Sequence, residues 1–145
     1  MSRHRGRTPR GRQDGQALVE FSFVLIPFLL LLLGTFDVGR GIYLYNGVAE
    51  AAREVARVTS VHVGNPTGSQ SETTAVVNQQ RGLVPNLSAP TFSCVDAAGA
   101  AVGHAPCQGG DGVKVTMSAP FSVVTPLLGL IGPFTFASSS TMLIP

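Results

Sequence analysis

Residues 15–33 read GQALVEFSFVLIPFLLLLL, an apolar run with one ionisable side chain, Glu20. The apolar character begins at Ala17 and extends in weaker form to Val38, a segment of 22 residues. An α-helix rises about 1.5 Å per residue, so this length is enough to cross a hydrocarbon core of about 30 Å. The stretch therefore predicts a membrane-spanning helix, with Glu20 placed only about one turn inside it.

The residues that precede the run are polar and basic. Residues 1–15 contain five arginines and one aspartate, so the rest of the chain has five basic and seven acidic side chains although the whole has a formal charge of +2. Basic residues that flank a membrane span are retained in the cytoplasm. We therefore expect a cytoplasmic leader over residues 1–15 and an extracytoplasmic location for everything beyond the helix. The leader lacks aromatic residues and has no basic fold behind it, so no nucleic-acid partner is expected.

A cleaved secretory signal is the alternative interpretation of a basic start and an apolar core. Such a signal would have a small-residue cleavage site directly after the apolar run. The sequence there is GTFDVGRGIYLYNG over residues 34–47, without an Ala-x-Ala pattern. Retention of the helix as a single-pass membrane anchor is therefore expected.

The helix is expected to continue beyond the membrane as an amphipathic stalk, giving one helical unit over residues 16–63. Small and apolar residues recur at steps of three and four between Tyr45 and Thr59. The opposite face carries four charged residues whose spacing allows ion pairs: Glu50, Arg53, Glu54 and Arg57. The Gly-Asn-Pro sequence at residues 64–66 should end the helix.

Residues 64–145 are expected to form a small extracytoplasmic α+β head. A capping-box spacing begins at Ser69 and predicts one short helix over residues 73–83, with Val76 and Leu83 on a single face. Pro85 should end this helix. We expect the short helix to pack on an antiparallel sheet of about three strands.

Three segments of the head have the pattern of strands. Residues 91–95 are followed by residues 113–117, where apolar and polar residues alternate. The second strand extends past Pro120, which suggests an edge position or a bulge because proline has no amide hydrogen. The last strand is expected to begin at Phe134, where two phenylalanines alternate with smaller residues. The apolar TPLLGLIGP at 125–133 is too short to span a membrane and predicts either a buried connection or a surface patch.

Two cysteines, Cys94 and Cys107, lie beyond the span, where the compartment is oxidising if the expected orientation holds. A disulfide between them would close a short loop and contribute on the order of 3 kcal/mol in the loop-entropy account. Two free thiols remain the alternative. A metal site is disfavoured because there is no CxxC spacing and His104 is the only nearby additional ligand.

The sequence contains no pattern typical of an enzyme. The three histidines are scattered, no nucleophile, histidine and acid occur in a supporting motif, and the glycines at 109–112 lack the lysine and helix of a phosphate-binding loop. We therefore expect a non-enzymatic protein without a metal or other cofactor.

The string GQALVEFSFVLIPFLLLLLGTFDVGRGIYLYNGVAEAAREVAR, residues 15–57, resembles the TadE-like family of pseudopilins or minor pilins of tight-adherence (Tad) pili. The resemblance consists of a glycine followed by a glutamate five residues later, Pro27 inside the span, the Gly39-Arg40 pair, and the alanine-arginine pairs near its end. It covers Gly15 to about Ser60, roughly a third of the chain.

The resemblance implies processing by a prepilin peptidase after Gly15, which makes Gln16 the new amino terminus. It also implies assembly with other subunits of a Tad pilus. The freed amine, with an ordinary pKa of about 7.7 to 8.0, could pair with Glu20 of the same or a neighbouring chain and so select one stagger between helices. In the alternative, Glu20 only extends to the lipid headgroups. A membrane-anchored binding module that does not polymerise is the competing function.

Overall fold

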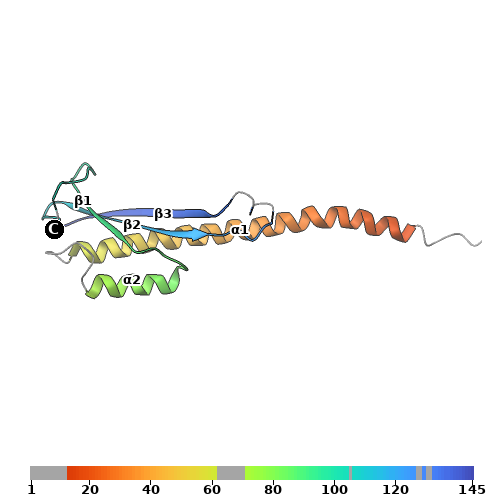
Figure 1. The fold of residues 1–145 in the computed structure, drawn as a ribbon, viewed down its shortest axis with the longest axis horizontal. Helices are drawn as coiled ribbons and strands as arrows, with labels where there is room; N and C mark the ends of the chain where they lie inside the picture. Colours follow the sequence, from red (N-terminus) through yellow and green to blue (C-terminus); the bar gives the residue numbers. More distant parts are fainter. Residues whose placement is uncertain (1–12, 62–70, 105, 127–128, 130–131) are drawn as a thin grey trace, which may run out of the picture.

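The computed structural model describes residues 13–61, 71–104, 106–126, 129 and 132–145 (Figure 1). These residues form, in chain order, α1 (Gln13–Val61), α2 (Ser71–Leu83), β1 (Thr91–Val95), β2 (Gly112–Phe121) and β3 (Phe134–Leu143). The expected α+β class is confirmed: a long apolar helix precedes one short helix and a three-stranded antiparallel sheet.

The helix α1 is continuous over 49 residues and contains Pro27. At about 1.5 Å per residue it is about 74 Å long. Its first half extends away from the other elements, and its second half lies along the sheet (Figure 1). Among the described residues it is the one helix long and apolar enough to cross a membrane. Most of the leader and the predicted stop at residues 64–66 lie outside the described residues.

The sheet has the order β1-β2-β3, with both neighbouring pairs antiparallel. The long pairing of β2 with β3 runs from Gly112 opposite Leu143 to Phe121 opposite Phe134. One face of β2 is buried, and it consists of alternate apolar residues: Val113, Val115, Met117, Ala119 and Phe121. The period of two expected from the sequence therefore directs one face of the sheet into the core.

The edge position suggested by Pro120 is wrong, because β2 is the central strand. The pairing of β1 with β2 ends at Thr116, so Pro120 lies past the end of β1. The backbone of Ser118 faces the β1 side, where it pairs with Ser88. Pro120, two residues on, faces the same side, so its missing amide hydrogen leaves no bond unmade in the β2–β3 ladder.

The core lies between the sheet and the second half of α1. Small residues of α1, Ala51, Ala52 and Ala56, are fully buried and let the strands approach the helix closely. Val48 and Val55 are fully buried on the same part of α1. The helix that covers the sheet is therefore α1, and this corrects the expectation that the short helix would cover it.

Among the described elements, α2 packs against α1 and not against a strand. It buries Thr73, Val77 and Gln80, whereas Leu83 is 60% exposed. The predicted Val76–Leu83 face is therefore only partly formed, because Val76 packs half-buried against the core and Leu83 does not. The helix α2 is rotated so that the hydroxyl of Thr73 meets that of Thr59 on α1 at 3.4 Å. The short helix does end before Pro85, as expected. The capping residue Ser69 lies outside the described residues.

Candidate functional site

The predicted processing and assembly residues lie on the exposed first turns of α1. Gly15, Gln16 and Glu20 are all exposed. The side-chain amide of Gln16 donates to Glu20 Oε1 at 3.2 Å, one helical turn away. A Cβ atom added to Gly15 would meet no other atom within 4 Å. Both the Gly15–Gln16 bond and the Glu20 carboxylate are therefore accessible from outside the chain.

Apart from Gln16 and Ser22, Glu20 stands in an apolar and exposed surface. Its neighbours on α1 include Leu18, Val19 and Phe21, which are 54 to 67% exposed. A carboxylate in a lipid-facing helix is costly unless it has a partner or reaches the headgroups. The geometry thus leaves Glu20 available to a cation supplied by another molecule.

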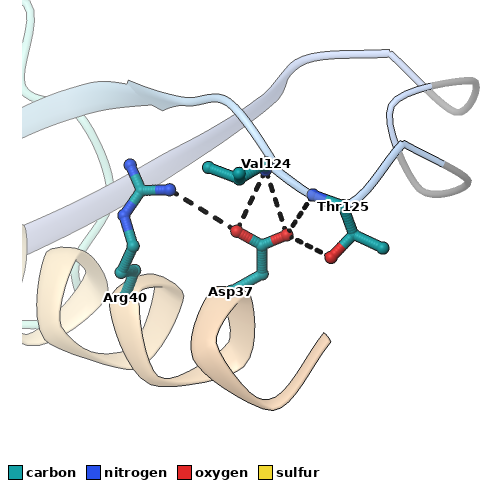
Figure 2. Close-up of polar contacts among 4 residues, drawn as sticks. All are labelled: Asp37, Arg40, Val124 and Thr125. Carbon is teal, nitrogen blue, oxygen red and sulfur yellow. Dashed lines mark hydrogen bonds and ion pairs between the residues drawn. The ribbon is translucent and has the colours of Figure 1, made fainter. Parts of the chain in front are cut away.

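A second polar site lies at the junction of the exposed and packed halves of α1. Asp37 is only 2% exposed, and its carboxylate binds the chain that follows β2 (Figure 2). The backbone amide of Val124 donates to both carboxylate oxygens at 3.0 Å, and Thr125 donates to Oδ2 through its amide at 2.8 Å and its hydroxyl at 2.7 Å. Asp37 therefore fastens the β2–β3 connection to α1.

Arg40 supports this junction one turn further along α1. Its Nη1 atom lies 3.4 Å from Asp37 Oδ1 (Figure 2). Its guanidinium carbon lies 5.9 Å from the ring centroid of Phe36 and 5.5 Å from that of Phe121. A guanidinium at these distances from aromatic faces gains cation–π attraction, so Arg40 joins the carboxylate to the aromatic residues around it.

Asp37 was not predicted as a site from the sequence. The groups that bind it on the head are 87 and 88 residues away and are mostly backbone amides. Backbone donors carry no sequence pattern. The one sequence signal was an acidic residue directly after the span, where its charge requires a partner if the chain folds back over it.

Two shallow grooves flank α1 beside this junction. One has a volume of about 580 Å³ and is bordered by Arg40, Tyr43 and residues 85–86. The other has a volume of about 410 Å³ and lies between α1 and the ends of β2 and β3. Its lining is almost wholly apolar, with Val38, Ile42 and Tyr45 on one side and Val123, Phe134 and Phe136 on the other.

The head carries a disulfide bond between Cys94 and Cys107. Near this bond, Asp111 Oδ2 accepts from the Gln108 amide and contacts His104 Nε2, both at 2.7 Å. The amide of Gln108, followed by the His104 side chain, holds the pKa of Asp111 below its ordinary value. These contacts fix the loop around Cys107. Within the described residues, no three His, Cys, Asp or Glu side chains gather as a metal site.

Comparison with known families supports the resemblance of the first third of the chain. Residues 15–57 match the sequence model of the family described as TadE-like protein. The match begins at Gly15 and covers most of α1, but none of α2 or the sheet. This family suggests a minor pilin associated with a Tad pilus. Neither the curated proteins nor the solved structures yield a match.

Proposed function

We propose that the protein is a TadE-like minor pilin or pseudopilin that takes part in assembling a Tad pilus used in adhesion or secretion. The observation that supports this most strongly is the family match over residues 15–57 on a helix whose first half is apolar and exposed. A prepilin peptidase is the processing partner, and other pilus subunits are the assembly partners. The head is extracytoplasmic and the leader cytoplasmic.

Cleavage after Gly15 would convert the backbone amide nitrogen of Gln16 into a free α-amine, one helical turn from Glu20. In the uncleaved chain the Glu20 carboxylate accepts only a neutral side-chain amide donor among the contacts of the described residues. A protonated amine is a stronger partner in an apolar environment, because each charge offsets the cost of burying the other. Processing would therefore convert this turn into an ion-pairing site.

Processing is tested by the mass of the protein recovered from cells that contain the peptidase. We expect the mature chain to begin at Gln16 and to lack residues 1–15. The change Gly15→Val should leave the chain uncleaved because it places a branched side chain at the cut. The matched control is Gly34→Val, since Gly34 is also a helical glycine with no neighbour within 4 Å of an added Cβ. An intact amino terminus in the parent would refute the processing step.

The assembly role of Glu20 is tested by Glu20→Ala, with membrane insertion and pilus number measured separately. We expect normal insertion and few or no pili. Glu50→Ala is the control, because Glu50 is an exposed carboxylate on the same helix, 3.6 Å from Arg53. If Glu20→Ala cells make pili as the parent does, the chain is better described as an anchored binding module that does not polymerise.

A further inference from the structure

The apolar groove between α1 and the end of the β2–β3 hairpin continues the exposed stripe of the membrane helix. Steps of seven residues, about two helical turns each, connect Val24, Leu31 and Val38 to Tyr45 along one face of α1. The first three are 60 to 72% exposed, and Tyr45 is 50% exposed. Val38 and Tyr45 also line the groove. Lipid that surrounds this stripe within the membrane would therefore be continuous with the groove.

The groove also lies at the depth of the membrane surface. If the hydrocarbon core begins at Ala17, its thickness of about 30 Å ends near Phe36. Val38 then lies about 3 Å, and Ile42 about 9 Å, beyond that boundary along the helix axis. The headgroup layer on each side of a bilayer is about 5 to 8 Å thick. The lower part of the groove therefore lies among the headgroups.

The composition of the groove suits that position. Tyr45 lines this groove and is 50% exposed, and the chain's other tyrosine, Tyr43, borders the neighbouring groove and is 69% exposed. Tyrosine is enriched at membrane surfaces because its ring is apolar and its hydroxyl is polar. The Asp37 carboxylate presents no free charge to the groove, because it is 2% exposed and bound to Val124 and Thr125.

The hairpin side of the groove is held rigidly by aromatic packing. The ring of Phe136 lies edge-on to Tyr45, with centroids 6.1 Å apart, and 5.6 Å from the ring of Phe121. Both phenylalanine rings come within 3.7 Å of the position that a Cβ atom would occupy on Gly41. The rings thus close the groove on the head side. Phe134 remains 41% exposed at its rim.

We propose that this groove is a lipid-contact surface, filled by lipids of the leaflet on the head side. The head is then seated on the bilayer along the end of its β2–β3 hairpin and is not held above it on a free stalk. The inference depends on α1 lying in a membrane and is independent of any role in a pilus. It adds a membrane contact from residues about 90 positions beyond the span.

The test uses the absence of tryptophan from the chain. Three full-length variants carry one tryptophan each: Phe134→Trp at the groove rim, Val38→Trp on its helix side, and Leu143→Trp as the control. Leu143 is 66% exposed and lies nine residues along β3 from Phe134, about 30 Å away. Each is placed in phosphatidylcholine vesicles in which the lipid is either plain or brominated near the headgroup end of the acyl chains.

We expect brominated lipid to reduce the emission of Phe134→Trp and Val38→Trp at least about twofold and to leave Leu143→Trp unchanged. Quenching of Val38→Trp alone would overturn the proposal, because the hairpin would then stand clear of the lipid. The proposal would also be overturned if neither groove tryptophan were quenched. An unquenched, blue-shifted Phe134→Trp whose shift disappears on dilution in lipid would assign the groove to a second copy of the chain. If Phe134→Trp loses the circular dichroism of the parent, Val123→Trp replaces it under the same criteria.

Discussion

At the residue scale, the most consequential side chain is Asp37. It is buried, yet it carries a carboxylate that accepts from two backbone amides and one hydroxyl. A buried carboxylate is tolerated when its oxygens are satisfied in this way, and it becomes a liability when they are not. One residue thus determines whether the end of the β2–β3 hairpin stays on the helix.

We predict that Asp37→Asn destabilises the head although the two side chains have the same shape. The NH₂ group of asparagine is a hydrogen-bond donor, and it would replace an oxygen that accepts from the backbone N–H groups of Val124 and Thr125. At least one of these hydrogen bonds would therefore be lost. The melting temperature should fall, and amide hydrogen exchange should accelerate first at residues 124–125. The control Glu50→Gln alters an exposed carboxylate that is 3.6 Å from Arg53 and should change little. Equal effects of the two changes would contradict the fastening role of Asp37.

Asp111 predicts a specific dependence of stability on pH. Its pKa is lowered in the folded chain by the Gln108 amide and the His104 side chain. The contribution of ionised Asp111 to the free energy of unfolding is therefore complete above its unfolded-state pKa of about 3.9. It is lost as the pH falls through the lower pKa of the folded state. We expect the difference in melting temperature between the parent and Asp111→Asn to be constant near neutrality and to shrink below about pH 4. A difference that stays constant down to pH 2 would contradict this account.

At the element scale, α1 determines both the span and the packing of the head. The same helix exposes large apolar residues in its first half and buries alanines and valines in its second. Two of its glycines differ in a way that the sequence does not reveal. An added Cβ on Gly47 would lie 2.9 Å from Val84 Cγ2, whereas one on Gly39 would meet nothing within 4 Å. Gly47 is therefore required for packing.

We predict that Gly39→Ala stabilises the protein and that Gly47→Ala does not. Alanine is better than glycine inside a helix by about 0.5 to 1 kcal/mol, so Gly39→Ala should stabilise by about that amount. At Gly47 the same gain is opposed by overpacking against the stiff, buried Val84, which typically costs about 1 to 3 kcal/mol. Gly47→Ala should therefore be neutral to destabilising by about 2 kcal/mol. Thermal or denaturant unfolding of both variants in one detergent makes the comparison, and equal stabilisation would refute the packing role.

The elements themselves were largely predictable from the sequence because each has a local cause. The apolar run predicts the long helix, and the alternation at residues 113–117 predicts a half-buried strand. The charged face of the stalk was also predicted, and its Arg53–Glu50 and Arg57–Glu54 pairs are present. The rotation of α2, the central place of β2 and the bonds of Asp37 were not predictable. They depend on contacts between residues far apart in the chain.

At the scale of the whole molecule, the core crosses the boundary expected between the helix and the head. Residues from Leu44 to Ala56 on α1 pack with β2 and with the chain around α2 in one cluster. The head therefore has no separate core made from residues 64–145 alone within the described part of the chain. Its folded unit includes the second half of α1.

We predict that a fragment of residues 64–145 fails to fold, whereas a fragment of residues 36–145 folds without the span. The shorter fragment lacks five fully buried α1 residues, Val48, Ala51, Ala52, Val55 and Ala56. The longer fragment keeps these and also Asp37. Circular dichroism and dispersed amide signals in nuclear magnetic resonance spectra would distinguish them. A cooperative unfolding transition in the 64–145 fragment would show that the head is independent of α1.

The side-by-side packing of the sheet on α1 has a mechanical consequence. If the spanning half is pulled along its axis during extraction from lipid, the load passes through the continuous helix from Gln13 to Val61. The sheet lies along that axis, so its contacts are loaded in shear and share the force (Figure 1). Asp37 is the first polar attachment that the load would reach. The arrangement distributes force that a flexible tether would concentrate at a single point.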